Sequence, residues 1–371
     1  MNGAAEVMRR RLALAARTPG LDADILQALS AASPQLECLE HADAPSLAAL
    51  GLTTQAIAYL ANPDGRRLDT DLRWLESPGN TLVGCCSPDY PDLLRHSPDA
   101  PAVLYVTGRL PVLREPQLAI VGSRNPTAGG RATARDFAAR FARLGLCITS
   151  GMALGIDAAS HEGALLADGL TVAVLGHGLD SVYPPEHAAL AERIAAQGAL
   201  VSEFPPGTPV QRHHFPRRNR IIAGLAHGTL VVEAAESSGS LITARLAGVA
   251  GREVFALPGS IHNPMVRGCH ELIRQGAKLV ERVEDVLAEL KISLSSQLLA
   301  SNAEFPVAGA PLDKEYKILL DALAFEPASV DNLIERTGMN SESIASMLLI
   351  LELDGHVAPH PGGRYSRMAG R

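Results

Sequence analysis

The chain has 371 residues, of which 47% are hydrophobic and 20% are charged, and its formal net charge is -7. Because this length exceeds what one hydrophobic core usually fills, we expect two or three domains. No apolar run reaches the roughly 18 residues that a membrane span requires, and the acidic balance argues against unselective binding to nucleic acid.

Residues 1–75 carry short helical patterns separated by Pro, Gly and Asp breaks. In stretches such as EVMRRRLALAAR, ADILQALSAA and TQAIAYLA, apolar residues recur every three or four positions. We therefore expect a small all-helical N-terminal domain. It loosely resembles a sterile-alpha-motif or helix-hairpin-helix-like domain. Its surface residues indicate no particular ligand.

Residues 76–290 alternate short β-branched runs with helical patterns. We expect strands at 81–85, 102–108, 117–122, 146–151, 171–176, 199–204, 229–234, 253–259 and 277–281. We expect helices near 127–144, 156–168, 187–197, 217–226, 240–250 and 268–276. Because the strands are almost continuously apolar, the sheet should be parallel and covered by helices on both faces. This pattern predicts an extended Rossmann-like α/β domain, in which ligands bind beyond the carboxyl ends of the strands.

Residues 291–312 are rich in Ser, Ala and Pro and show no sustained period, which is typical of a linker. Residues 313–371 carry three helical patterns and then a Gly-tipped hairpin, which together predict a winged helix-turn-helix domain. The third helical pattern, NSESIASMLLILELDG, contains no Lys or Arg and is poorly suited to a DNA major groove. Only Arg364 and Arg367, in the expected wing, are placed to contact phosphate.

The first candidate site is the segment QLAIVGSRNPTAGG, where a buried strand ends. Gly122, Ser123 and Arg124 should form a sharp turn before a helix that begins near Thr127. Backbone N–H groups and the positive end of the helix would meet there, which suits a phosphate. The segment lacks G-x-G-x-x-G spacing and a ribose-binding acid about twenty residues on, so a dinucleotide site is disfavoured. An ordinary strand-to-helix turn with a surface arginine is the alternative.

The second candidate site is the start of the helix that follows EAAESSGS. Ser238, Gly239 and Ser240 could simply cap this helix, which is the commoner role of such residues. The same geometry would also form a second anion site at the carboxyl end of a strand. Two such sites on one edge of one sheet outline a groove.

The third candidate site is the basic segment RHHFPRRNRIIAGLAHG, residues 212–228. It lies in a stretch, 204–232, that contains no Asp or Glu, so the local field is positive although the whole chain is acidic. We expect Arg212 and Phe215 to lie on a loop, because Pro216 should prevent the helix from starting earlier. An aromatic ring in such a place offers a nucleobase a stacking surface worth roughly 1–3 kcal/mol.

Arg217, Arg218 and Arg220 should fall in the first turns of the helix in this segment, where cations do not complement the helix dipole. Guanidinium groups bind phosphates in a bidentate manner, which gives a reason for their position. The alternative is that these arginines pair with carboxylates from other segments, for which Glu203, Glu233 and Glu236 are available, and that Phe215 belongs to the core.

A fourth pattern, SGMALGIDAASHEGAL, places Asp157 and His161 one helical turn apart, as an acid–base pair would require. A buried hydrogen bond that orders a loop is the more frequent reason for such a pair, and no nucleophile lies beside it in the sequence. The chain has no metal-ligand cluster, Walker loop or paired-carboxylate signature. We therefore expect neither a metal nor a cofactor.

Eight fragments between about 80 and 290 resemble the DNA processing protein A family, also called DprA or Smf. They are VGSRNPTAGG, SGMALGIDAASHEGAL, VAVLGHGLDSVYPPEH, SEFPPGTP, HHFPRRNRIIAGL, EAAESSGSLITARLA, GREVFALPGSI and GCHELIRQGAKLV. The resemblance implies a Rossmann-like core that binds single-stranded DNA, forms a homodimer and loads RecA recombinase during natural transformation. It also implies DNA contacts at Gly122, Ser123, Arg124, Arg212, Phe215, Arg218, Asn219 and Arg220, and it identifies the C-terminal part as the winged-helix module of the family.

We therefore expect a cytoplasmic, non-enzymatic protein that binds and protects single-stranded DNA. An odd number of cysteines, five, without C-x-x-C spacing fits a reducing compartment. The main alternative is an enzyme, because the core more distantly resembles nucleotide phosphoribohydrolases with a P-G-G-x-G-T-x-x-E loop. The comparable SSGSLITAR stretch has no Glu after its glycine, and the next is Glu253. A further alternative is a transcription regulator whose winged helix reads duplex DNA.

Overall fold

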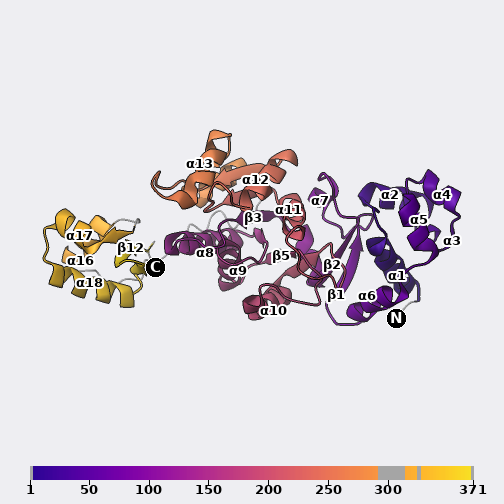
Figure 1. The fold of residues 1–371 in the computed structure, drawn as a ribbon, viewed down its shortest axis with the longest axis horizontal. Helices are drawn as coiled ribbons and strands as arrows, with labels where there is room; N and C mark the ends of the chain where they lie inside the picture. Colours follow the sequence, from indigo (N-terminus) through magenta and orange to yellow (C-terminus); the bar gives the residue numbers. More distant parts are fainter. Residues whose placement is uncertain (1–2, 291–313, 324–326, 369–371) are drawn as a thin grey trace.

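The computed structural model describes residues 3–290, 314–323 and 327–368 (Figure 1). The linker predicted at 291–312 lies outside these residues. The first 75 residues are helical as predicted, in six helices with frequent Asp or Thr caps that accept amide hydrogen bonds. These helices are α1 (Gly3–Arg17), α2 (Ala23–Ala32), α3 (Cys38–His41), α4 (Ala44–Ala49), α5 (Thr54–Ala61) and α6 (Gly65–Leu75).

All nine strands predicted for the central part of the chain are present, and they form one sheet in the order β1-β2-β6-β5-β4-β3-β7-β8-β9. Their bounds are β1 (Asn80–Gly84), β2 (Val103–Gly108), β3 (Gln117–Val121), β4 (Cys147–Ser150), β5 (Thr171–Leu175), β6 (Ala199–Ser202), β7 (Gly228–Val231), β8 (Glu253–Ala256) and β9 (Lys278–Leu279). Strands β3, β4 and β5 are buried along their whole length, as their continuous apolar character predicts.

The prediction of a wholly parallel sheet is wrong at one edge. β2 pairs antiparallel with both β1 and β6, whereas all the strands from β3 to β9 in chain order are parallel to one another. A run of apolar residues indicates burial on both faces but not strand direction. β1 and β2 are buried over most of their length, so their apolar pattern resembles that of the parallel strands.

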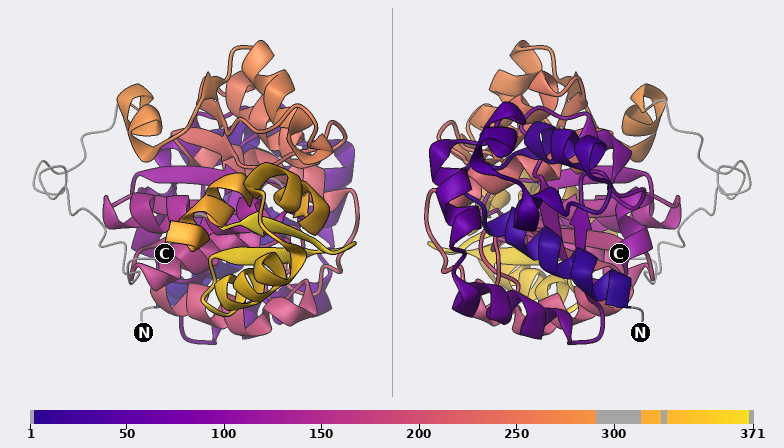
Figure 2. Two further views of the ribbon diagram at one scale, coloured as in Figure 1. Left: turned by 90° about the vertical axis from the view of Figure 1, so that its left-hand side faces the viewer. Right: turned by 90° about the vertical axis from the view of Figure 1, so that its right-hand side faces the viewer.

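Helices cover both faces of the sheet (Figures 1 and 2). The helices α8 (Ala128–Arg143), α9 (Ile156–Leu166) and α10 (Ala188–Gln197) lie on one face, and α11 (His214–Leu225), α12 (Ser240–Val249) and α13 (Arg267–Arg274) lie on the other. Shorter elements connect them: α7 (Asp92–Arg95), η1 (Leu110–Arg114), η2 (Pro185–His187), η3 (Pro264–Val266) and α14 (Val283–Glu289). Side chains of each strand alternate between the two layers, so Ile120 packs toward α8 and Val121 toward the α12 side.

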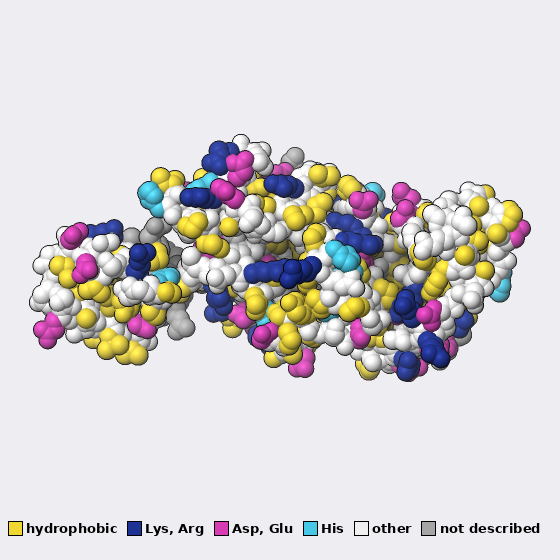
Figure 3. All heavy atoms as spheres, in the orientation of Figure 1, with side chains coloured by type: hydrophobic (Ala, Val, Ile, Leu, Met, Phe, Trp, Pro, Cys, Tyr) yellow, Lys and Arg dark blue, Asp and Glu magenta, His cyan; other side chains and the backbone are white. Residues whose placement is uncertain are grey.

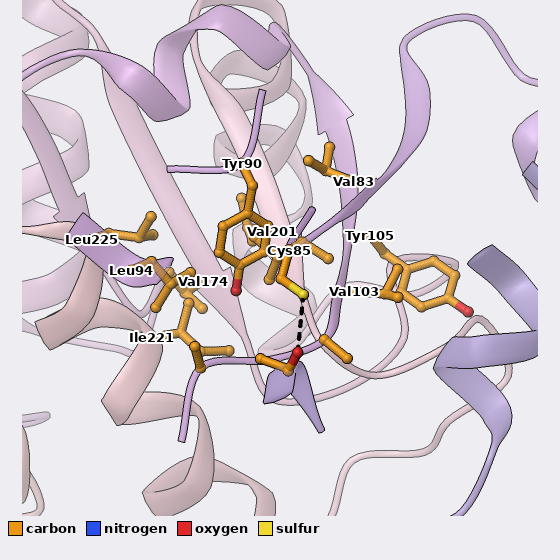
Figure 4. Close-up of a cluster of buried hydrophobic side chains, with 14 of the residues drawn as sticks. Val83, Cys85, Tyr90, Leu94, Val103, Tyr105, Val174, Val201, Ile221 and Leu225 are labelled. Atoms are coloured by element: carbon orange, nitrogen blue, oxygen red, sulfur yellow. Dashed lines mark hydrogen bonds between the residues drawn. The ribbon is translucent and has the colours of Figure 1, made fainter. Parts of the chain in front are cut away.

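The N-terminal helices share a hydrophobic core with the sheet. Figure 4 shows a part of this core, where Tyr90, Val174 and Ile221 pack together and the Cys85 thiol donates a hydrogen bond of 3.5 Å to the Ala23 carbonyl. Burial raises the pKa of the Cys85 thiol to about 12, so the thiol stays protonated in this core.

A buried ion pair also joins the N-terminal helices to the sheet. Arg17 of α1 donates two hydrogen bonds, of 2.6 and 2.7 Å, to the carboxylate of Asp71 in α6. The Tyr105 hydroxyl group, in β2, donates to the same carboxylate at 3.2 Å, and Arg17 donates to the Pro206 carbonyl at 3.0 Å. Removing one partner of such a pair leaves an uncompensated buried charge, which costs about 3–5 kcal/mol.

The C-terminal part has the winged-helix elements predicted from the sequence. They are α16 (Lys314–Leu323), β10 (Ala328–Ser329), α17 (Val330–Thr337), α18 (Ser341–Leu353), β11 (Val357–His360) and β12 (Arg364–Arg367). Gly338 ends α17 with a φ of +69°, a left-handed conformation that favours glycine at the end of a helix. In the wing, Arg367 forms an ion pair of 3.0 Å with Asp321.

Candidate functional site

The strand order of the sheet reverses between β3 and β7. From β3 the chain builds one half through β4, β5 and β6, and it then crosses over to build the other half through β7, β8 and β9. In doubly wound sheets the crevice at such a point, beyond the carboxyl ends of the strands, is where ligands bind. A pocket of about 770 Å³ lies there, between the loops that follow the strands and the first turns of α11 and α12.

Most of the residues predicted to contact DNA line this pocket. They are Gly122, Ser123 and Arg124 after β3, Arg212, Phe215, Arg218 and Asn219 before and within α11, and Ser238, Gly239 and Ser240 at the start of α12. Arg217 and Arg220 do not line it. Three segments that lie far apart in the sequence therefore meet at one edge of the sheet.

The loop after β3 is fixed to the segment that follows the neighbouring strand β7. The backbone N–H of Ser123 donates a hydrogen bond of 2.7 Å to the Glu233 carbonyl, and the Ser123 hydroxyl oxygen accepts one of 3.1 Å from the Asn125 N–H. A side chain at Gly122 would lie 2.7 Å from Ile156. This loop is therefore held tightly, while the Arg124 side chain at its tip is exposed.

The start of α8 does not offer the open phosphate site that the sequence suggested. The carboxylate of Glu233 accepts hydrogen bonds from the Thr127 backbone N–H at 2.9 Å and from the Thr127 hydroxyl group at 2.6 Å. Thr127 is also the N-cap of α8, because its hydroxyl oxygen accepts from the Gly130 N–H at 2.9 Å. An internal carboxylate thus occupies the place at the helix end that an anion would take.

The start of α12 differs from that of α8, because no carboxylate of the described residues forms a hydrogen bond with it. Gly239 is its N-cap residue and provides no side-chain capping hydrogen bond. The Ser238 and Ser240 hydroxyl groups are hydrogen-bonded to each other at 2.7 Å, and the Ser240 N–H makes a long contact of 3.4 Å with the Ser238 hydroxyl oxygen. The Leu241 and Ile242 N–H groups donate to the Ser238 and Gly239 carbonyls at 3.1 and 3.2 Å, so the Ser238 and Ser240 hydroxyl groups are the polar groups that this end offers to an anion in the pocket.

Helix α11 starts earlier than predicted, at His214. Phe215 therefore lies in its first turn and not on a loop. The N–H groups in the first turn of a helix have no acceptor within the helix, so Pro216, which lacks an N–H group, is tolerated there. The half-buried Phe215 ring faces two guanidinium groups: Cζ of Arg124 lies 5.5 Å and Cζ of Arg218 lies 6.0 Å from the ring centroid.

Arg218 forms the floor of the pocket together with Asp157. The buried Arg218 guanidinium group donates to the carbonyl groups of Gly151, at 2.7 Å, and Val174. Asp157 accepts from the backbone N–H groups of Gly151 and Ala153 at 3.2 and 3.4 Å. Burial lowers the pKa of Arg218 to about 10 and raises the pKa of Asp157, and the opposite charge of each group offsets part of this effect.

His161 and Asp157 are not paired. His161 Nδ1 contacts the Thr171 hydroxyl oxygen at 2.7 Å, and this hydroxyl group itself donates to the Ile148 carbonyl at 2.6 Å. The Thr171 oxygen therefore accepts a hydrogen bond from Nδ1–H, and Nε2 is buried with no hydrogen-bond partner among the described residues. Burial lowers the pKa of His161 to about 3. The histidine is a neutral core residue, so both the acid–base pair and the buried His161–Asp157 hydrogen bond that the motif suggested are absent.

Arg217 and Arg220 follow the alternative left open by the sequence. Arg220 donates two hydrogen bonds, of 2.9 and 2.7 Å, to the buried carboxylate of Glu203, and Arg217 lies 3.2 Å from the same carboxylate. The Arg217 guanidinium group also lies 5.7 Å above the ring of Phe204. These two cations are therefore used to neutralise Glu203 beside the pocket.

Arg124 and Arg212 differ from the other arginines of this region. Both are exposed at the pocket, and neither forms an ion pair with another residue that the structure describes. Figure 3 shows Lys and Arg side chains in the middle of this face, over the region in which Figure 1 labels β5. A guanidinium group without a carboxylate partner attracts a phosphate more strongly than a paired one.

Sequence reasoning missed Tyr183, Asn125 and Thr243 as pocket residues. Tyr183 is 45% exposed, and its ring centroid lies 6.0 Å from that of Phe215. It follows a predicted strand, so the rule that ligands bind beyond the carboxyl ends of strands could have identified it.

The described part of the chain shows no cluster of three His, Cys, Asp or Glu residues arranged to hold a metal ion. Within the same ranges, no helix combines the length and apolar character that crossing a membrane demands.

Comparison with known proteins gives consistent matches over most of the chain. Residues 81–291 match the family model of DNA recombination-mediator protein A, and residues 303–363 match that of the DprA winged helix domain. The chain is 44% identical to Protein Smf of Escherichia coli (strain K12) over 326 residues, which cover 87% of each protein. It is 46% identical to the DNA processing protein DprA of Streptococcus pneumoniae over 202 residues, 54% of this chain and 71% of that protein.

Two solved structures share the fold. The X-ray structure of DNA processing protein A from Streptococcus pneumoniae matches with a TM-score of 0.66 and 35% identity, over 75% of this chain and 96% of that one. The structure of DNA processing protein A from Helicobacter pylori, described for its single-stranded DNA binding mode, matches with a TM-score of 0.52 and 27% identity. It covers 56% of this chain and 94% of its own.

Proposed function

Because the chain belongs to the DNA recombination-mediator protein A family, also called DprA or Smf, we propose that it binds single-stranded DNA in the pocket between β3 and β7. The observation that carries the proposal is that one pocket is lined by the Phe215 ring and by two exposed arginines without carboxylate partners among the described residues: Arg124, which faces the ring, and Arg212. The Helicobacter pylori relative, described as a single-stranded DNA-binding protein, supports it.

Each group has a separate task in this proposal. Arg124 and Arg212 neutralise backbone phosphates, and the Ser238 and Ser240 hydroxyl groups at the start of α12 contact another. Phe215 stacks on a base, and Asn219 at the pocket wall adds a polar contact. A charge and a stacking surface do not read base edges, so binding has little sequence specificity.

A single strand fits this site better than a duplex. The Phe215 ring is half-buried inside a pocket, so a base reaches it only when that base is unpaired and free to turn away from its neighbours. The net charge of -7 opposes unselective attraction of duplex DNA elsewhere on the surface. The expected binding therefore depends on the local positive field at the pocket.

We further propose that the protein protects incoming single strands in the cytoplasm and loads RecA onto them in natural transformation, as a homodimer. Two pockets on one dimer would raise the affinity for longer strands through effective concentration. The winged helix contributes little to strand binding, because α18 contains no Lys or Arg and Arg367 is paired with Asp321. The family assignment supports this role, and RecA assembly on a single strand, with and without the protein, measures it directly.

The proposed protein is a binding protein and not an enzyme. The carboxylate in the pocket, Asp157, is buried and hydrogen-bonded to backbone N–H groups beside Arg218, which suits a structural charge. Incubation with AMP and related nucleoside monophosphates should release no free base. Sustained release of base would contradict the binding-only function and favour the phosphoribohydrolase alternative.

The binding proposal is tested by measuring affinities for a fluorescein-labelled dT oligonucleotide and for a duplex of equal length as the salt concentration rises. We expect tighter binding to the single strand and a steep loss of affinity with salt, because counterions compete for the phosphates. Equal or tighter binding to the duplex would refute the assignment, and so would affinity that does not respond to salt.

A further inference from the structure

Tyr183 lies at the rim of the pocket, in the loop between β5 and η2. Its side chain is 45% exposed, although tyrosine is a large aromatic residue. The described residues offer its hydroxyl group no hydrogen bond, so no polar contact explains its position. An aromatic ring that stays open to solvent beside a pocket points to a surface that a ligand covers.

The ring of Tyr183 is set beside the ring of Phe215. The two centroids lie 6.0 Å apart and the ring planes are inclined by 40°. A base held between two rings needs roughly 7 Å, which is about twice the ~3.5 Å contact distance of stacked carbon atoms. The two rings are therefore too close and too tilted to hold one base between them, and each has to use a separate face.

The two rings differ in accessibility. Phe215 is half-buried and already faces the guanidinium groups of Arg124 and Arg218, at 5.5 and 6.0 Å. Tyr183 has no cation over its ring among the described residues and is the more exposed of the two. Its ring therefore offers the more open stacking surface at this edge of the pocket.

We propose that Tyr183 is a second base-stacking residue, which receives the nucleotide next to the one that stacks on Phe215. This inference rests on the proposed binding of single-stranded DNA. The distance of 6.0 Å between the ring centroids of Tyr183 and Phe215 exceeds the roughly 3.4 Å that separates stacked nucleotides along one strand of B-form DNA. Two neighbouring bases on these rings must be unstacked from each other, which an extended single strand permits and a duplex does not.

The test measures binding of dA and dT oligonucleotides by four variants of the full chain. Tyr183→Ala should lower the affinity at least about fivefold, the equivalent of the smallest base–aromatic stacking contribution. Tyr183→Phe should bind like the original chain. Tyr183→Leu keeps apolar contact with Phe215 but has no ring, so it should bind as weakly as Tyr183→Ala. Leu166→Ala, a 63% exposed residue of α9 outside the pocket, is the matched control and should change nothing.

Three further readouts separate stacking from charge and from loss of structure. The salt dependence should stay unchanged in Tyr183→Ala, because no phosphate contact is removed. The quenching of 2-aminopurine in the oligonucleotide should decrease at one position in Tyr183→Ala and at the adjacent position in Phe215→Ala. The melting temperature of Tyr183→Ala should equal that of the original chain, since the ring is exposed.

The possible failures are distinguishable. If the original chain shows no preference for single strands, the proposed function and this inference both fail. If Phe215→Ala weakens binding but Tyr183→Ala does not, the pocket binds DNA and Tyr183 is not a stacking residue. If Tyr183→Leu restores full affinity, the side chain only supports Phe215 by packing, and the inference is overturned.

Discussion

Two neighbouring glycines at the start of α8 give the sharpest test of how the pocket is built. A Cβ atom at Gly130 would lie 2.7 Å from Oε2 of Glu233 and closer still to Cδ and Oε1 of the same carboxyl group. A Cβ atom at Gly129 would meet only the Thr127 hydroxyl oxygen, at an ordinary contact distance of 3.8 Å. Alanine substitution of the two glycines therefore has opposite expected effects, although both stand in the same helix turn.

Gly129→Ala should stabilise the protein by about 0.5–1 kcal/mol, because alanine loses less backbone freedom in a helix than glycine does. Gly130→Ala should gain the same stabilisation from the lost backbone freedom of glycine. Its methyl group should, however, displace the buried Glu233 carboxylate from Thr127. Two hydrogen bonds to a charged group contribute about 1.5–3 kcal/mol each, so the net loss should be about 2–5 kcal/mol.

The comparison needs denaturant unfolding of both variants and DNA binding by the same samples. Gly130→Ala should also bind single strands more weakly. The Glu233 backbone carbonyl accepts the hydrogen bond from the Ser123 N–H, so a displaced Glu233 should also shift the loop that contains Arg124. A Gly130→Ala variant as stable as Gly129→Ala would show that the Glu233 contact does not stabilise this loop.

Three further predictions concern charge, pH and the C-terminal part. Arg124→Ala and Arg212→Ala should each weaken binding to all single-strand sequences alike, and each should reduce the salt slope by about 0.7 for every phosphate that is no longer neutralised. The control variant Arg274→Ala removes an exposed arginine of α13 and should change neither the affinity nor the salt slope. Unchanged affinity in both pocket variants would leave the site unsupported. The pKa of His161 is lowered to about 3 in the folded chain and is near 6.5 in the unfolded chain. As the pH falls through 6.5, only the unfolded chain therefore binds this proton. The free energy of unfolding should fall by about 2 kcal/mol between pH 6.5 and 5. His161→Asn, which lacks the titrating group, should lose less free energy of unfolding over that range, and parallel pH profiles of the two proteins would contradict the assignment. Deletion of residues 310–371 should leave most single-strand affinity intact, as an anisotropy titration would show, and near-complete loss would assign the main DNA contact to the winged helix.

The sequence predicted the strands well because burial on both faces leaves a simple pattern of continuous apolar residues. The same pattern could not reveal that β2 runs antiparallel, since an apolar run carries no information on direction. Pro216 misled the prediction for α11, because a proline marks a helix boundary only when its missing N–H would have been needed.

The site was predictable in outline because the carboxyl ends of parallel strands meet at one edge. Which arginines remain available for a ligand was not predictable, since it depends on carboxylates that the fold brings close. Glu203 pairs with Arg217 and Arg220, whereas Arg124 and Arg212 have no such partner among the described residues. Glu233 likewise reaches the start of α8 only after folding, so no local sequence pattern shows that this helix end is occupied.

The most direct test of the account is photocrosslinking of the full chain to a single strand that carries 5-iododeoxyuridine, with the modified peptides identified by mass spectrometry. We predict crosslinks to Phe215 and to the loop of Arg124, at the pocket between β3 and β7. Crosslinks confined to the N-terminal helices or to the winged helix, with none at the pocket, would contradict the central claim.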